Sequence, residues 1–208
     1  VFVGRLVGYK GVDVLVKAMS RLKDVHCVIV GEGPKKEDLK RLSEQEGAAR
    51  RIRFTGHVPD KELPAYLHAA DLFVLPSVSR NEAFGICQLE AMAAGLPVIS
   101  TDLESGVPWV NQHEQTGFVV PPRDVDALAE AIRILVEDRD RAKALGERGK
   151  QRVLEMFTAE RMVGLHEELY REFLNGNDMD NSPSPNSSRS GKKSVAGNRS
   201  SPLPPGDG

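Results

Sequence analysis

The stretch DLFVLPSVSRNEAFGICQLEAMAAGLPVIS, residues 71–100, contains a complete strand–helix–strand pattern. An apolar run at 71–76 is followed by a polar loop, and a helical pattern then ends at Gly95, a residue that often terminates helices. Pro97 stops the helix from continuing and begins a second apolar run at 97–100. A helical connection of this kind joins parallel strands of one sheet. The stretch therefore predicts a parallel sheet.

The same alternation of strand and helix extends in both directions from this stretch. Short apolar runs, rich in Val, Ile and Phe and bounded by Gly or Pro, predict further strands at 1–6, 26–31, 52–56 and 117–120. Helical patterns are predicted at 11–22, 35–47, 60–69, 85–94 and 124–137. Several of the strands are apolar throughout, as expected where both faces are covered. We therefore expect an α/β fold, a Rossmann-like, doubly wound parallel sheet of about six strands with helices on both faces.

Composition limits the classes of ligand and compartment. The chain has 208 residues, 40% of them hydrophobic, and its net charge of −2 gives it no overall attraction to nucleic acid or lipid. Cys27 and Cys87 each lie in an apolar run and form no metal-binding spacing, which predicts free thiols in a reducing compartment. No apolar run reaches the length of a membrane span, and we recognise no signal peptide, so we expect a cytoplasmic protein.

The two ends of the chain differ from its middle. The chain opens within a predicted strand and without an initiator Met, so we expect it to begin partway through a longer protein, with its first strand truncated. After two more helical patterns, at about 139–156 and 158–174, Ser, Pro, Gly and Asn predominate from 175 to 208. We expect this polar tail to be disordered. Its four basic residues could contact anionic lipid, but a solvated tail is the favoured interpretation.

Two cations lie near the end of the first predicted strand. In GRLVGYKG, residues 4–11, Arg5 ends the strand and Lys10 comes just before the first helix. A planar guanidinium fork, a mobile ammonium and a helix N-terminus together suit phosphate oxygens. Two solvated surface charges are the alternative interpretation, which holds for most such pairs taken alone.

Gly31 and Gly33 suggest a second phosphate site, but the pattern is incomplete. Both follow a predicted strand in VIVGEGPKKED, residues 28–38, where a dinucleotide-binding fingerprint would require a third Gly or an Ala at the position of Lys36. No acidic residue on a following strand has the required context either. We therefore reject a nicotinamide site and interpret both glycines as parts of a strand-to-helix turn.

The central loop and helix carry two carboxylates eight positions apart. Glu82 lies in the loop at the carboxyl edge of the sheet, and Glu90 lies about one turn into the helix. Gly85 lets the backbone approach a ligand closely, and the free N–H groups of Gly85, Ile86 and Cys87 lie at the positive end of the helix dipole. Phosphate suits this position, and the carboxylates can accept hydrogen bonds from diols. Glu82 as a helix cap and Glu90 as a lysine partner are alternatives for each residue alone.

Four segments resemble, in order, the carboxyl-terminal half of the family 4 (group 1) retaining glycosyltransferases: VGRLVGYKGVDVLVKAM, GEGP, IRFTGHVPDKELPAYLHAADLFVLPS and NEAFGICQLEAMAAGLPVIS. The resemblance covers about residues 1–174 and leaves the tail of 175–208 outside. It implies one half of a GT-B fold, in which two Rossmann-like domains face each other across a cleft. It also implies that 1–174 is the domain that binds the nucleotide sugar, which is the donor.

The resemblance implies roles for the charged candidates. Glu82 would be the catalytic residue and would bind hydroxyls of the transferred sugar, whereas Glu90 would bind the ribose of the nucleotide. Arg5 and Lys10 would hold the diphosphate. Because this basic pair and the helix dipole supply the positive charge, no metal and no separate cofactor are expected.

Backbone groups complete the donor site that the resemblance implies. The N–H groups of Gly85 and Ile86 would contact the diphosphate, and groups around Val58 would meet the base. Ala83 and Phe84, between Glu82 and the helix, belong to the same set; Ala83 stands where many members of the family have Gly.

The predicted function is transfer of a sugar, with retention, from a nucleotide-diphosphate sugar to an acceptor saccharide or a lipid-linked glycan. GDP-mannose and UDP-sugars are both considered as donors. In the family the amino-terminal domain supplies the acceptor site, so the resemblance implies that this chain binds donor but is inactive alone. A lipid-linked acceptor would bring peripheral contact with the inner face of the membrane. The alternatives are a sugar-nucleotide epimerase or phosphorylase on the same fold, and a non-catalytic nucleotide-binding subunit.

Overall fold

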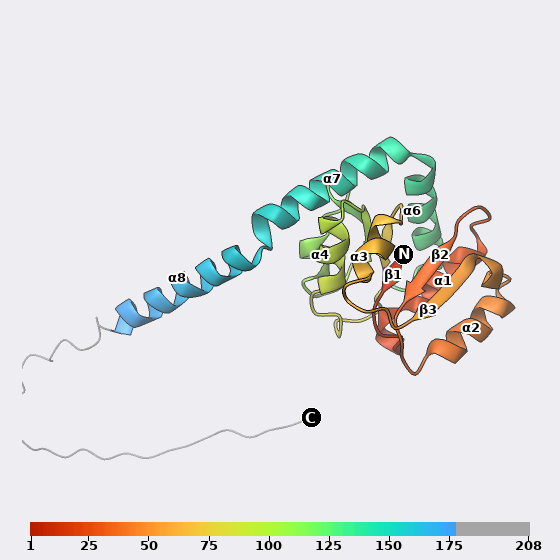
Figure 1. Cartoon of the computed structure of the whole chain (residues 1–208), viewed down its shortest axis with the longest axis horizontal. Coiled ribbons are helices and arrows are strands. Elements are labelled where there is room, and N and C mark those ends of the chain that lie inside the picture. The colour runs from red at the N-terminus through yellow and green to blue at the C-terminus, as the bar shows by residue number, and fades with distance from the viewer. Residues whose placement is uncertain (178–208) are drawn as a thin grey trace, which may run out of the picture. The chain divides into compact units, whose positions relative to one another are not determined.

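The computed structural model describes residues 1–177, in which strands and helices alternate up to residue 137 and two further helices follow (Figure 1). The strands are β1 (Phe2–Val3), β2 (Cys27–Val30), β3 (Ile52–Gly56), β4 (Phe73–Leu75), β5 (Val98–Thr101) and β6 (Gly117–Val120). The helices are α1 (Val12–Ser20), α2 (Lys36–Gln45), α3 (Leu63–His68), α4 (Ile86–Ala93), α5 (Val107–Val110), α6 (Val125–Glu137), α7 (Arg139–Met156) and α8 (Ala159–Asn177). Two short 3-10 turns are η1 (Gly8–Lys10) and η2 (Ala49–Arg51).

The strands form two three-stranded parallel sheets, β1-β2-β3 and β4-β5-β6, that continue into one another. Val1 makes the connection: its amino group donates to the carbonyl oxygen of Leu72 at 2.8 Å, and its carbonyl accepts from the N–H of Val74 at 2.9 Å. The strand order is therefore β3-β2-β1-β4-β5-β6, that of a doubly wound sheet. The predicted parallel α/β fold is confirmed.

Two apolar clusters cover the two faces of these sheets. Val74 belongs to the cluster that contains residues of α1 and α6, whereas Phe73 and Leu75 belong to the cluster that contains residues of α4 and α5. Neighbouring residues of one strand divide in this way because successive side chains point to opposite faces. Helices on both faces leave the carboxyl ends of the strands and the loops that follow them as the place for a ligand.

The chain divides into two units, Val1–Gly164 and a second that begins at Leu165, so the division falls within α8. The helix predicted at 158–174 is present as α8, and its apolar residues are exposed, among them Leu165, Leu169, Tyr170 and Phe173. Of the predicted disordered tail, residues 175–177 belong to α8, and residues 178–208 lie outside the described part of the chain. Among the helices described, none is both long and apolar enough to cross a lipid bilayer.

Candidate functional site

Gly31 and Gly33 allow two strand-end loops to pack against each other. A Cβ atom on Gly31 would lie 1.9 Å from the carbonyl oxygen of Gly4, and one on Gly33 would lie 2.4 Å from that of Leu6. The backbone N–H of Leu6 also donates to the carbonyl of Glu32 at 2.9 Å. Both glycines therefore have a structural role in the turn after β2, where they admit the loop after β1.

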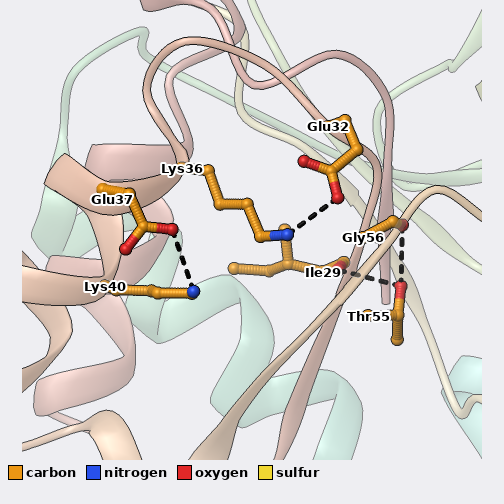
Figure 2. Close-up of polar contacts among 7 residues, drawn as sticks. All are labelled: Ile29, Glu32, Lys36, Glu37, Lys40, Thr55 and Gly56. Atoms are coloured by element: carbon orange, nitrogen blue, oxygen red, sulfur yellow. Dashed lines mark hydrogen bonds and ion pairs between the residues drawn. The ribbon is translucent and has the colours of Figure 1, made fainter.

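This packing carries Arg5 to an open groove of about 460 Å³ whose wall also includes Val58. Glu32 lines the same groove, but its carboxylate accepts a hydrogen bond from Nζ of Lys36 at 2.7 Å, and that bond lowers the pKa of Glu32 (Figure 2). Arg5 is exposed and makes no ion pair with any residue from 1 to 177. Its guanidinium is therefore available to an anionic ligand in the groove.

Glu90 lines a second hollow, of about 300 Å³, which adjoins the groove of Arg5. Asp60 and Leu63 line both spaces. Burial raises the pKa of Glu90, and the negative charge of Asp60 raises it further. The structure thus places Arg5, Val58 and Glu90 along two adjoining hollows.

Glu82 is buried and forms an ion pair with Lys10. The distance from Nζ of Lys10 to Oε2 of Glu82 is 2.6 Å, and the same oxygen accepts a hydrogen bond of 2.8 Å from Oγ of Ser77. A Cβ atom on Gly4 would lie 3.6 Å from Nζ of Lys10, and Gly4 lines the groove of Arg5. Lys10 therefore lies between the buried carboxylate and the groove.

Gly85 begins α4 in the left-handed conformation, with φ of 71°. A Cβ atom there would lie 2.6 Å from Cδ2 of Leu75, so both the backbone angle and the space favour glycine. No side chain caps this helix, and Ile86 in its first turn is 68% exposed. The N–H groups of Gly85 and Ile86 donate to no residue from 1 to 177, so they can donate to a ligand.

Ala83 and Phe84 have structural partners of their own. The carbonyl of Ala83 accepts from the N–H of Gly106 at 2.7 Å. The ring of Phe84 packs against those of Trp109 and Phe157, with centroid distances of 6.1 and 6.0 Å. These contacts attach the loop of Glu82 to the segment after β5. Because the Phe84 ring is packed against other rings, the backbone of this loop is the part that can contact a ligand.

Three charged side chains act on the thiol of Cys87, in the first turn of α4. Burial raises the pKa of its thiol to about 11, and the charges of Lys10, Glu82 and Glu90 all act on it. Lys10, Glu82 and Glu90 therefore lie near the start of this helix, whereas Arg5 and Val58 line the groove described above. The protonated thiol is a weak nucleophile, so Cys87 is not a candidate for covalent catalysis.

Ser77 and Asp60 are residues of the site that the sequence analysis did not select. Ser77 lies two residues after the end of β4 and binds Glu82, and Asp60 lies in the loop after β3 and raises the pKa of Glu90. Their position just after parallel strands is the signal that could have identified them, because those strand ends meet at the ligand-binding edge of the sheet.

The charges and hydroxyl acceptors suit an elongated ligand with an anionic centre. Arg5, Lys10 and the N-terminus of α4 can bind phosphate oxygens. The carboxylates of Glu82 and Glu90 can accept hydrogen bonds from hydroxyl groups. Across residues 1–177 no group of three or more His, Cys, Asp and Glu side chains is arranged to hold a metal ion.

Comparison with known proteins relates this chain to one family. The family model of glycosyl transferases group 1 matches residues 1–152. The GDP-mannose-dependent alpha-(1-6)-phosphatidylinositol monomannoside mannosyltransferase of Mycobacterium tuberculosis (strain CDC 1551 / Oshkosh) is 40% identical over 187 residues, which cover 86% of this chain and 47% of that protein. The chain thus spans about half the length of this and other curated relatives that it matches.

Solved structures share the fold. Sucrose-phosphate synthase from Thermosynechococcus elongatus superposes with a TM-score of 0.75 at 32% identity, over 84% of this chain and 46% of that one. The carboxyl-terminal domain of a glycosyl transferase group 1 family protein (LpcC) from Francisella tularensis superposes with a TM-score of 0.68 at 25% identity, over 76% of this chain and 85% of that domain. The α/β fold described above is accordingly that of one half of a GT-B glycosyltransferase. With its family-model match, its 40% identical relative and this fold, the chain belongs to the group 1 glycosyl transferases.

Proposed function

We propose that the protein containing this chain transfers a sugar, with retention at the anomeric carbon, from a nucleotide-diphosphate sugar to an acceptor glycan or lipid-linked saccharide. In this proposal residues 1–174 form the donor-binding half. The observation that carries it is the position of Lys10, which pairs with Glu82 at 2.6 Å and lies beside the groove that holds Arg5. A donor has a diphosphate for the cations and sugar hydroxyls for the carboxylate.

The diphosphate of the donor lies between Arg5, Lys10 and the N–H groups of Gly85 and Ile86 in this proposal. Negative charge grows on the diphosphate as the bond to the sugar breaks. Positive groups that are already in place stabilise this charge without reorganisation. The chain's own cations and helix dipole supply this stabilisation, and the proposal requires neither a metal ion nor a cofactor.

In this proposal the nucleoside occupies the two adjoining hollows, those lined by Arg5 and by Glu90. Glu90 accepts hydrogen bonds from the ribose hydroxyls, and the backbone around Val58 meets the base. Asp60 lines both hollows, and its carboxylate has only acceptor oxygens. Guanine offers N–H donors on two neighbouring atoms of its pairing edge, whereas uracil offers one N–H between two carbonyls. We propose that the carboxylate of Asp60 accepts from N1 and N2 of a guanine base, which would favour a guanine nucleotide.

GDP-mannose is the donor that we propose first, ahead of UDP-sugars. Besides Asp60, the proposal is supported by the relative at 40% identity, whose name describes a GDP-mannose-dependent mannosyltransferase acting on a phosphatidylinositol monomannoside. A lipid-linked acceptor of that class would bring the protein to a membrane surface. Because the chain spans about half of its relatives, we further propose that the acceptor site lies in the other half and that this chain alone does not transfer sugar.

A thermal-shift panel tests the proposed function. The 208-residue chain is heated with GDP, UDP, ADP, GDP-mannose and UDP-glucose in separate samples. A ligand at 100 times its dissociation constant should stabilise the fold by about 2.7 kcal/mol, and we expect the guanine nucleotides to act at the lowest concentrations. No shift with any nucleotide or nucleotide sugar would contradict donor binding. Product analysis with radiolabelled GDP-mannose and the complete protein would distinguish transfer from epimerisation.

A further inference from the structure

Ser77 has no part in the donor contacts proposed above, yet it binds the carboxylate at their centre. It follows Pro76 at the end of β4 and is fully buried, with 0% exposure. Its hydroxyl donates to Oε2 of Glu82 at 2.8 Å. A hydrogen bond to a buried carboxylate is charge-assisted and is therefore stronger than a bond between neutral groups.

The backbone holds Ser77 in place from two sides. Its carbonyl accepts a hydrogen bond of 2.6 Å from Oγ1 of Thr101, which ends β5 and is itself buried. The next residue, Val78, donates its N–H to the carbonyl of Tyr9 at 2.8 Å, in the loop after β1. Ser77 is thus fixed both to a neighbouring strand and to the loop that carries Lys10.

The two carboxylate oxygens of Glu82 have different surroundings. Oε2 receives both the ammonium of Lys10 and the hydroxyl of Ser77. Oε1 accepts no hydrogen bond from the residues that the structure describes, and it is not one of their buried atoms without a partner, so it reaches the surface. Oε1 therefore keeps a free acceptor for a ligand.

Ser77 and Lys10 hold Oε2 in different ways. Lys10 has a long side chain with a mobile charge that can also reach a phosphate. Ser77 has a short side chain on a fixed backbone, so its bond to Glu82 can persist while Lys10 binds the diphosphate. Without Ser77, the position of the carboxylate would depend on Lys10 alone.

We propose that Ser77 is a positioning residue whose hydroxyl holds Oε2 of Glu82, so that Oε1 stays directed at the sugar of the bound donor. This inference rests on the proposed function, because it assigns the unpaired oxygen Oε1 to a sugar hydroxyl. Ser77 acts through Glu82 and makes no contact with the diphosphate. Its loss should therefore weaken recognition of the sugar and leave recognition of the nucleotide unchanged.

Calorimetry with GDP and GDP-mannose on the 208-residue chain tests this role. The variant is Ser77→Ala, and the matched control is Ser100→Ala, which removes another fully buried serine hydroxyl, on β5, bound by Nδ2 of Asn111 at 2.8 Å. For Ser77→Ala we expect the dissociation constant of GDP-mannose to rise about tenfold and that of GDP to change less than about twofold. Ser100→Ala should change neither constant.

Other outcomes would overturn either the role of Ser77 or the proposed function. Equal losses for GDP and GDP-mannose in Ser77→Ala, or the same small effect in both variants, would overturn the positioning role while leaving donor binding intact. Binding of neither ligand by the unmodified chain would overturn the proposed function and this inference with it. If Ser77→Ala does not fold, Ser77→Cys keeps a similar size with a weaker donor, and it should show the same selective loss to a smaller extent. An unchanged GDP-mannose affinity in a folded Ser77→Cys variant would count against the inference.

Discussion

Nζ of Lys10 lies 2.6 Å from Oε2 of Glu82, with 11% of the lysine side chain and 9% of the glutamate side chain exposed. Charges this well buried are costly unless they are paired. A diphosphate that draws Lys10 away leaves the charge of Glu82 without its partner, unless sugar hydroxyls take the place of the ammonium. A donor carries both groups, whereas the nucleotide product carries only the diphosphate. The pair therefore favours donor over product.

Replacing Glu82 with Gln should affect GDP and GDP-mannose in opposite directions. The neutral amide releases Lys10, so the affinity for GDP should increase by about 1 kcal/mol, a severalfold lower dissociation constant. GDP-mannose should bind less tightly, because its sugar loses a hydrogen bond to a charged acceptor that contributes about 1.5–3 kcal/mol. Calorimetry measures both constants, and Glu147→Gln, at an exposed position of α7, should change neither. Parallel losses for both ligands would contradict the coupling of Lys10 and Glu82.

Replacing Arg5 with Ala should weaken GDP binding by about 1.5–3 kcal/mol, because a charged hydrogen-bond donor to the diphosphate is lost. Guanosine, which has no phosphate, should bind Arg5→Ala as it binds the unmodified chain. Arg5→Lys should recover part of the affinity for GDP, since the charge returns without the planar fork. Arg133→Ala is the control, because Arg133 already binds Glu130 and Glu137 on α6. An unchanged affinity for GDP in Arg5→Ala would remove the anion site from the groove.

Glu90 should make the folded chain less stable as the pH rises. Burial and the charge of Asp60 raise the pKa of Glu90 above its ordinary value of about 4.3. The folded state thus holds this proton more tightly than the unfolded state does. The resulting stabilisation is present at low pH and is lost as the pH rises from the ordinary pKa through the raised one.

Urea unfolding at several pH values between about 4 and 7 measures this effect. Glu90→Gln cannot lose a proton, so its free energy of unfolding should increase relative to that of the unmodified chain as the pH rises. Glu130→Gln is a control of opposite sign, because hydrogen bonding to Arg133 lowers the pKa of Glu130. Parallel pH profiles for Glu90→Gln and the unmodified chain would contradict the raised pKa.

Gly85 and Gly95, at the two ends of α4, allow backbone strain to be separated from effects on the site. Both have positive φ, 71° and 82°, so alanine at either position should cost roughly 1–2 kcal/mol of stability. A Cβ atom on Gly85 would also lie 2.6 Å from Leu75, whereas one on Gly95 would meet nothing within 4 Å. We expect Gly85→Ala to lose more stability and to weaken GDP binding, and Gly95→Ala to bind GDP normally. Equal GDP affinities in the two variants would show that the N-terminus of α4 does not contact the diphosphate.

Much of the fold could be predicted because the strands are short apolar runs that Gly and Pro separate from the helices. The helix predicted at 85–94 is present as α4, Ile86–Ala93, beginning after Gly85 and ending before Gly95. The helix α5, Val107–Val110, was not predicted, because a helix of four residues is too short to show a helical period. The strand predicted at 1–6 is reduced to β1, Phe2–Val3, because the chain from Gly4 onward packs as a loop against the turn after β2.

The sequence grouped those candidate residues that share one local segment. It did not predict contacts between residues of different segments. Glu82, Gly85 and Glu90 lie in a single loop and helix, so their spacing placed them together. The pairing of Lys10 with Glu82 joins loops that follow different strands, and no local pattern predicts it. Ser77 could not be predicted, because a single serine in a loop has no distinctive spacing. Its role is visible only in its buried hydrogen bond to Glu82.

Titration of the 208-residue chain with GDP-mannose in a calorimeter tests the central claim, donor binding by this half of the protein, most directly. The comparison is with an Arg5→Ala, Glu90→Ala double variant, in which both substitutions lie at open hollows and should leave the fold intact. We predict one GDP-mannose bound per unmodified chain and an affinity weaker by about 3 kcal/mol or more in the double variant. The same affinity in both proteins, or no binding of GDP-mannose or any other nucleotide sugar by the unmodified chain, would contradict the account.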